Sequence, residues 1–265
     1  MMPLSAKPIR AACALLIALV LLAPSAASPR VDGRAAMVER IRARAGADFP
    51  ALVRDPHFAA ALAAVAATDR ERFVRRRDRA LAYGDTPLPI GHGQTISDAY
   101  IVTVMTAALA LPPRASVLEV GTGSGYQAAI LSRLAASVHS IEIVAPLARA
   151  AGRRLKRLRF ANVSVRAGDG YLGWPEAAPY DAIIVTAGAA RVPAPLLEQL
   201  KPGGTLVMPI GPQWALEQLV VIRKAPDGRL ASCSMGAALF VPLTGRGERP
   251  ANPTGLYDRS LPDCY

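Results

Sequence analysis

Two hydrophobic periods alternate along the central part of the chain. Short apolar runs are typical of buried parallel strands, and the stretches between them repeat apolar residues every three to four positions, as amphipathic helices do. The ranges expected are strand 116–120, helix 126–135, strand 138–142, helix 146–158, strand 163–166, strand 181–185, helix 194–200 and strand 204–208. This order predicts an α/β fold with a doubly wound, mostly parallel sheet and helices on both faces.

Both flanks of this region depart from the pattern. Helices are expected before it over 34–44, over 56–67 and from the Ser97-Asp98 cap to about 110, so the sheet carries an N-terminal helical addition. The stretch 83–95 holds so many Gly and Pro residues that it is expected to be a loop. On the C-terminal side of the central region, runs at 217–223 and 230–235 predict an antiparallel hairpin. The tail beyond Leu243 is expected to be irregular.

The first 27 residues have the composition of an export signal. Lys7 and Arg10 precede an apolar stretch over 11–23, and small residues up to Ala27 suit a signal peptidase. The stretch is shorter than the about 20 residues of a spanning helix. We expect a cleaved signal peptide over 1–27, export to a bacterial periplasm and no stable membrane insertion afterwards. An uncleaved anchor and a wrongly assigned start are the alternatives.

Composition limits the remaining chain to one main domain. With 265 residues, 52% of them hydrophobic, the sequence can bury the core of a single α/β unit. We assign 28–245 to it, with N-terminal helices and a substrate loop over 34–110, a sheet over 116–245 and an irregular tail over 246–265. After the leader only Cys233 and Cys264 remain, so one disulfide at most is possible and no metal site is expected.

The net charge of +11 falls to about +9 without the leader, because residues 1–27 contain two cations and no acid. A basic protein attracts anionic partners such as nucleic acid. Here the arginines fall in helical runs without interleaved aromatic residues, which favours a solvated helix face and no nucleic-acid partner.

The run 117–126, Val-Leu-Glu-Val-Gly-Thr-Gly-Ser-Gly-Tyr, turns an apolar strand into a helix through three alternate glycines. Glycine permits positive φ and close approach of a ligand, and the helix start offers free N–H groups. A dinucleotide fingerprint needs glycine where Tyr126 stands. The pattern Glu-x-Gly-x-Gly-x-Gly resembles Rossmann-like S-adenosyl-L-methionine-dependent methyltransferases, although a mere tight turn is the alternative.

Acidic residues follow the next strands, at the sheet edge where α/β proteins bind ligands. Glu142 ends the second strand and can accept hydrogen bonds from ribose hydroxyls, unless it is a surface residue. Asp169, in Gly168-Asp-Gly170, stands where methyltransferases place a side chain against the adenine amino group, or forms an ordinary turn. Glu119 is expected to orient the loop or a water near the cofactor, with a purely structural role equally open.

The polar run Gln94-Thr-Ile-Ser97 begins a helix and can bind a carboxylate through hydroxyl and N–H groups. The alternative is that Ser97 only caps the helix. His92 precedes this run and is interpreted as a loop residue. Asp98 places a negative charge beside the site, where it could weaken binding of an anionic substrate or simply favour the helix start.

Several runs together resemble the protein-L-isoaspartate O-methyltransferase family over about 34–245. They are 70–74, 88–98, 117–126, 162–163, 168–170, 179–186, 201–204, 208–211 and 240–243. The resemblance implies Ser97 as the active-site serine and Thr95 and Ile96 as substrate contacts. It implies a cofactor site formed by Glu119, Gly121, Thr122, Gly123, Gly125, Glu142, Asp169, Gly170 and, after the last run, Thr244.

This family methylates the free carboxylate of L-isoaspartyl and, as a further candidate, D-aspartyl residues in damaged proteins. The carboxylate is already ionised at neutral pH, so the reaction needs alignment rather than a strong base. The resemblance implies a protein-repair transferase, a monomer whose partners are damaged proteins or peptides; the family's usual compartment is the cytoplasm. A methyltransferase with another substrate and an exported non-catalytic relative are the alternatives.

Overall fold

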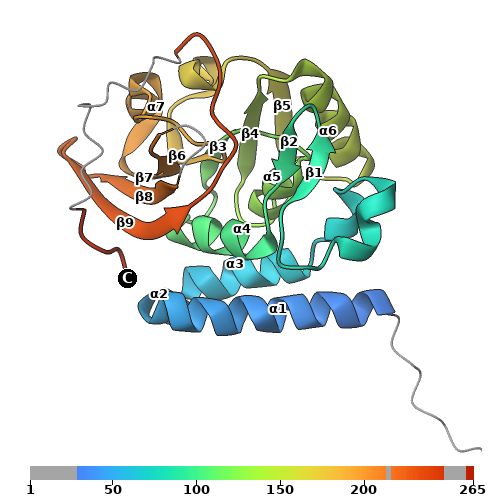
Figure 1. Cartoon of the computed structure of the whole chain (residues 1–265). Coiled ribbons are helices and arrows are strands. Elements are labelled where there is room, and N and C mark those ends of the chain that lie inside the picture. Colours follow the sequence, from blue (N-terminus) through green and yellow to red (C-terminus); the bar gives the residue numbers. More distant parts are fainter. Residues whose placement is uncertain (1–28, 213–215, 248–260) are drawn as a thin grey trace, which may run out of the picture.

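A seven-stranded sheet forms the centre of the protein (Figure 1). The structure is a computed structural model that describes residues 29–212, 216–247 and 261–265, so the predicted leader lies outside the described residues. The strand order is β5-β4-β3-β6-β7-β8-β9. The strands are β3 (Ser116–Val120), β4 (Ser137–Glu142), β5 (Val163–Ala167), β6 (Tyr180–Val185), β7 (Leu200–Ile210), β8 (Glu217–Lys224) and β9 (Leu230–Ala238).

Five strands run parallel, β8 runs against them and β9 turns back again. β3 to β7 pair in parallel register, whereas β8 pairs antiparallel with both β7 and β9. β3 lies between β4 and β6, so the strands that follow β3 are added first on one side of it and then on the other. At such a switch point a crevice lies at the carboxyl ends of the strands. The predicted fold class, including the C-terminal hairpin, is confirmed.

Alternating side chains divide the core into two clusters, as the pleat of a strand requires. Val117 and Val207 pack toward one face of the sheet, and Leu118 and Leu206 toward the other, all fully buried. The first face is covered by α3 (Pro56–Ala66), α4 (Ala99–Ala108), α5 (Tyr126–Leu131) and α6 (Ala145–Arg157), and the second by α7 (Ala194–Gln199).

The N-terminal helices form an outer layer. α1 (Pro29–Asp48) is longer than expected, and it packs with α2 (Pro50–Arg54) against α3 and α4 below the sheet in Figure 1. None of the helices in the described ranges combines the length and apolar character that a membrane crossing requires.

The expectation of a loop over 83–95 is wrong. β1 (Leu88–Gly91) and β2 (Gln94–Ile96) form an antiparallel hairpin, with Leu88 opposite Ile96. His92 and Gly93 form its turn with φ of 54° and 72°. Both Leu88 and Ile96 are buried, and a proline is tolerated in a two-stranded ribbon that has free edges. Breaker residues therefore shape this hairpin rather than prevent it.

The cysteine question left open by the sequence is settled by the C-terminal segment. Cys233 on β9 and Cys264 form a disulfide, with Cα atoms 5.1 Å apart. The backbone N–H of Cys264 donates to the Ser234 carbonyl at 2.9 Å, and that of Ser234 to the Pro262 carbonyl at 2.8 Å. Residues 261–265 are thus tied to the outer edge of the sheet.

Candidate cofactor and substrate site

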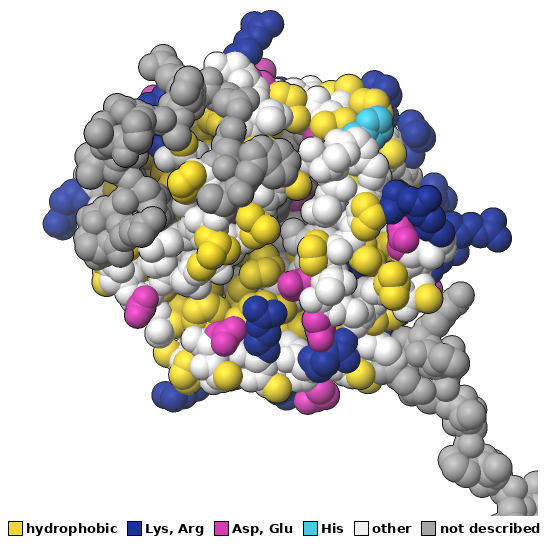
Figure 2. All heavy atoms as spheres, viewed as in Figure 1, with side chains coloured by type: hydrophobic (Ala, Val, Ile, Leu, Met, Phe, Trp, Pro, Cys, Tyr) yellow, Lys and Arg dark blue, Asp and Glu magenta, His cyan; other side chains and the backbone are white. Residues whose placement is uncertain are grey.

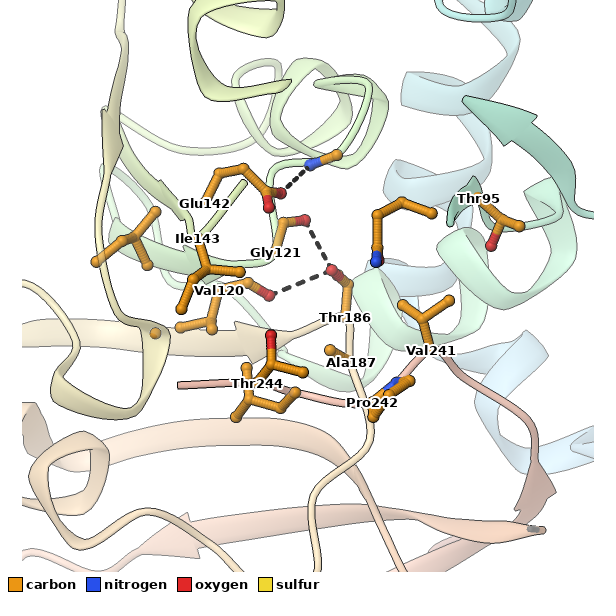
Figure 3. A pocket seen from close by; sticks show the side chains of 15 residues that line it. Thr95, Val120, Gly121, Glu142, Ile143, Thr186, Ala187, Val241, Pro242 and Thr244 are labelled. Atoms are coloured by element: carbon orange, nitrogen blue, oxygen red, sulfur yellow. Dashed lines mark hydrogen bonds between the residues drawn. The ribbon is translucent and has the colours of Figure 1, made fainter. Parts of the chain in front are cut away.

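The glycine loop between β3 and α5 is held by a threonine from β6. Gly121, Gly123 and Gly125 have φ of 99°, 50° and 85°, which side chains with a Cβ rarely adopt. The Thr186 hydroxyl, directly after β6, lies 2.8 Å from the Gly121 carbonyl and 3.2 Å from that of Val120 (Figure 3). A Cβ on Gly121 would collide with this hydroxyl. The loop therefore needs glycine for both its backbone conformation and its packing.

Glu142 stands at the carboxyl end of β4 and faces the same loop. Its Oε2 accepts a hydrogen bond from the Gly123 N–H at 2.7 Å, and its Oε1 accepts from the Val144 N–H at 2.9 Å. The side chain is only 6% exposed. Each oxygen keeps a second lone pair, so a fixed carboxylate is available to hydroxyl donors at the position predicted from the strand order.

A first pocket, which we call the glycine pocket, opens between these groups. It brings together six predicted residues, Thr95, Gly121, Gly123, Glu142, Gly170 and Thr244. In Figure 3 Glu142 and Gly121 lie on one side of this space, Thr95 on another and Thr244 across from them. Residues of β2, β3 and β4 and of the segments that follow β3, β4, β5 and β6 contribute to this wall, so only the folded sheet assembles it.

Four predicted cofactor residues, Asp169, Gly125, Glu119 and Thr122, lie outside the residues that line this pocket. Asp169 accepts from the N–H groups of Tyr171 at 2.9 Å and Arg246 at 2.7 Å, so its carboxylate organises the two adjoining backbone segments. Gly125 is the N-cap of α5 and lies against Leu155 of α6. The assignment of these two residues to the cofactor stays a prediction.

The third residue, Glu119, lies fully buried behind the loop. Burial raises its pKa to about 8, and the nearby Glu142 carboxylate adds to this rise. The Ser140 hydroxyl donates to Glu119 Oε2, and Thr122 is hydrogen-bonded to Ser140 in turn. Glu119 therefore contacts the loop through two hydroxyl groups. This arrangement supports the positioning role expected for it.

A second pocket, the serine pocket, adjoins the first. It is lined by Thr95 and Ile96 of β2 and by Ser97 directly after it, together with Thr122 and the start of α5. Thr95, Gly121, Gly123 and Thr186 line both pockets, so the two spaces share a wall. The predicted substrate residues are thus beside the predicted cofactor loop, although 24 positions separate Ser97 from Gly121 in the sequence.

The interpretation of Ser97 as a helix cap is wrong. Asp98 is the N-cap of α4, and its Oδ1 accepts from the Ile101 N–H at 2.9 Å. Asp98 also exerts a favourable charge interaction on Arg70, a fully buried guanidinium whose pKa is lowered chiefly by burial. The carboxylate that the sequence places beside the site therefore has structural partners, which leaves the Ser97 side chain to line the serine pocket.

Sequence reasoning missed several lining residues. Thr186, Ile143 and the pair Val241 and Pro242 line the glycine pocket, and Gln127 and Met105 line the serine pocket. The backbone of Gly188 pairs with Val241 and Leu243, which brings the 240–243 segment across the sheet edge. Thr186 could have been found, because it follows a parallel strand in the same way as Glu142.

These groups fit S-adenosyl-L-methionine. Glu142 offers a carboxylate to ribose hydroxyls, Gly121 and Gly123 let backbone approach, and Val120, Ile143 and Leu243 offer apolar surface to a purine ring. Ile143 is 41% exposed, so a bound ligand could bury its apolar surface. Among the residues that the structure describes, no group of three His, Cys, Asp or Glu side chains could hold a metal ion.

The fold and this site define a Rossmann-like methyltransferase that uses S-adenosyl-L-methionine. The model of the protein-L-isoaspartate(D-aspartate) O-methyltransferase family matches residues 52–248. The chain belongs to this family.

Individual relatives agree with the family match. The chain is 53% identical over 181 residues to protein-L-isoaspartate O-methyltransferase 2 of Syntrophobacter fumaroxidans, covering 68% of this chain and 73% of the relative. It is 47% identical over 213 residues to protein-L-isoaspartate O-methyltransferase 1 of Cupriavidus necator, covering 80% and 82%. A solved protein-L-isoaspartate O-methyltransferase superposes with a TM-score of 0.69 at 27% identity, over 80% of this chain and 66% of that one.

Proposed function

We propose that this chain transfers the methyl group of S-adenosyl-L-methionine to the free carboxylate of L-isoaspartyl residues in damaged proteins and peptides, with D-aspartyl residues as further substrates. One observation carries this proposal: Thr95, Ile96 and Ser97 line a pocket that shares a wall with the glycine pocket. A substrate group held by the first set lies next to a cofactor held by the second. The names of the relatives supply the substrate class.

The residues of the chain align the reactants and exclude water. The substrate carboxylate is ionised at neutral pH, so no side chain has to remove a proton from it. The Ser97 hydroxyl donates a hydrogen bond to one carboxylate oxygen and leaves the other oxygen to react. S-adenosyl-L-methionine, held by Glu142 and the glycine loop, would supply an activated methyl group to that oxygen. Apolar lining by Ile96 and Met105 limits competing water.

Substitution of Ser97 tests this assignment. Ser97→Ala should lower single-turnover methylation of an isoaspartyl peptide at least about tenfold, equivalent to about 1.4 kcal/mol of transition-state stabilisation. Cofactor affinity in calorimetry and the melting temperature should change little, because Asp98 rather than Ser97 caps α4.

Ser164→Ala is the matched control, since Ser164 is an exposed serine on β5 that lines neither pocket. An aspartyl peptide of the same sequence measures selectivity. Methylation of the aspartyl peptide at the rate of the isoaspartyl one would reject the substrate assignment. An unchanged rate in Ser97→Ala would reject the role of the serine.

We also propose that the chain acts as a monomer in an oxidising compartment such as the bacterial periplasm, after removal of residues 1–27. The Cys233–Cys264 disulfide supports export, because disulfides persist in oxidising compartments and are rare in the cytosol.

A further inference from the structure

A third cavity lies on the face between α1, α4 and β9, and we call it the flank cavity. Its volume is about 290 Å³. Its floor is apolar and comes from distant parts of the sequence, with Phe49 after α1, Val104 on α4, Leu219 on β8 and Met235 on β9. In Figure 2 hydrophobic side chains gather in a hollow above α1, with Lys or Arg and Asp or Glu side chains along the rim.

Two elements contribute lining residues both to the flank cavity and to the reaction site. Ile101 in the first turn of α4 lines both the flank cavity and the serine pocket. Ala238 lines the flank cavity, and Val241, three residues later, lines the glycine pocket. Leu239 between them is 68% exposed, which is unusual for a large apolar residue. Apolar residues of α4 and of the segment after β9 therefore link the two sets of lining residues.

The charged groups at the rim of the flank cavity, Arg44 and Asp48, pair with each other and with Tyr100. The Arg44 guanidinium lies 3.9 Å above the centre of the Tyr100 ring, and the Tyr100 hydroxyl donates to Asp48 Oδ2 at 2.5 Å. Arg44 and Asp48 also form an ion pair at 3.4 Å. These contacts leave no net charge at the mouth, so the cavity favours an apolar guest over an acidic or basic one. Its volume of about 290 Å³ is enough for one large apolar side chain and lies at the lower end of the about 300–1,000 Å³ that is usual for small-molecule sites.

We propose that the flank cavity is a specificity subsite that binds one large apolar side chain near the isoaspartyl residue of the peptide substrate. This inference rests on the proposed function. An extended peptide whose isoaspartyl carboxylate lies against Ser97 passes Ile101 and Leu239 and places a neighbouring side chain over Phe49 and Met235. The enzyme therefore prefers damage sites that are flanked by an apolar residue.

A peptide series tests the subsite. Isoaspartyl peptides carry Leu, Ala or Lys at each flanking position in turn, and KM is measured for each. At one position Leu should lower KM about tenfold relative to Ala, the gain expected for burying a large apolar side chain, and Lys should not. Ala237→Phe should abolish this preference, because Ala237 lines the cavity, is exposed and can accept a larger side chain without displacing the core.

Ala231→Phe is the matched control, since Ala231 is also exposed on β9 but lies outside the cavity lining. It should keep the preference for Leu. The peptide flanked only by Ala should react equally with wild type and both variants, and its turnover reports the proposed function independently of the subsite. No preference in wild type, or a preference that survives Ala237→Phe, would overturn the inference. A wild-type dimer in sedimentation that Ala237→Phe dissociates would assign the cavity to self-association and likewise reject it.

Discussion

At the scale of single residues, the buried carboxyl group of Glu119 links the glycine loop to the stability of the fold. It has no exposed surface, and it accepts the Ser140 hydroxyl. Burying a carboxylate in this way is costly, so the neutral form is favoured and the pKa rises to about 8. The loop is therefore held by a group that is mostly protonated at neutral pH.

Glu119→Gln should change how stability depends on pH. The folded pKa is about 8 and the ordinary value is 4.5, so between these values the folded state binds more protons than the unfolded state. Stability contributed by Glu119 is therefore complete below the ordinary pKa and is lost as pH rises toward 8. Glutamine keeps a neutral side chain of the same shape.

The free energy of unfolding of Glu119→Gln relative to wild type should increase across this window by up to about 1.4 kcal/mol per pH unit. Urea unfolding of both proteins at a series of pH values measures the difference. Parallel curves for the two proteins would show that Glu119 is ionised in the folded state.

At the scale of elements, the start of α4 separates two neighbouring polar residues with different tasks. Asp98 caps the helix, and Ser97, one residue earlier, lines the serine pocket. From the sequence either residue could be the N-cap, since serine and aspartate are both favoured at that position. Backbone geometry decided between them: Asp98 is extended with ψ of 158°, and its carboxylate accepts from the Ile101 N–H.

Asp98→Ala should lower the free energy of unfolding by about 1 kcal/mol through loss of the cap. Asp98→Asn is the informative control, because it keeps the capping oxygen and removes the charge near Arg70. If the cap is what matters, Asn should retain most of the stability in urea unfolding. Equal losses in both variants would instead assign the effect to the charge interaction with the buried guanidinium.

The hairpin of β1 and β2 is the element that the sequence analysis did not predict. Its glycines and prolines are typical of loops, and its strands span only 88–91 and 94–96. The burial of Leu88 and Ile96 against the core is what stabilises it, and this contact exists only once α4 and the N-terminal helices are in place. Thr95 and Ser97 owe their position beside the glycine loop to this hairpin.

At the scale of the whole molecule, the C-terminal segment closes one edge of the sheet. β9 is the last strand, and residues 261–265 cover part of its free edge through backbone hydrogen bonds at Ser234 and the disulfide. Cys264 and Tyr265 also pack against the core. An edge covered in this way is protected from pairing with other chains.

The proposed export makes a prediction about the protein in its native cell. The recovered protein should begin within a few residues of Ser28, as shown by N-terminal sequencing, and Cys233 and Cys264 should react with a thiol reagent only after reduction and unfolding. Reduction should lower the free energy of unfolding by about 2–4 kcal/mol. A product that retains Met1 in the cytosolic fraction, with both thiols free, would contradict the proposal.

The sequence by itself determined the fold class and the local chemistry of the site. Short apolar runs placed β3 at its observed bounds and the other central strands within a few residues, since parallel strands that are buried on both faces need apolar residues throughout. The spacing of Gly121 and Gly123 and the acidic ends of strands marked one sheet edge, because parallel strands bring their carboxyl ends together. Such signals are local, and the sequence carries them in full.

Only the tertiary structure decided which of those residues share a surface. It placed Thr186 under the glycine loop and Asp169 against Arg246, and it formed the flank cavity from α1, α4 and β9. These contacts join residues far apart in the chain, and no local pattern of hydrophobic and polar positions encodes them. They follow from the order of strands in the sheet and from the packing of helices on it, which is the physical reason that the substrate subsite could not be read from the sequence.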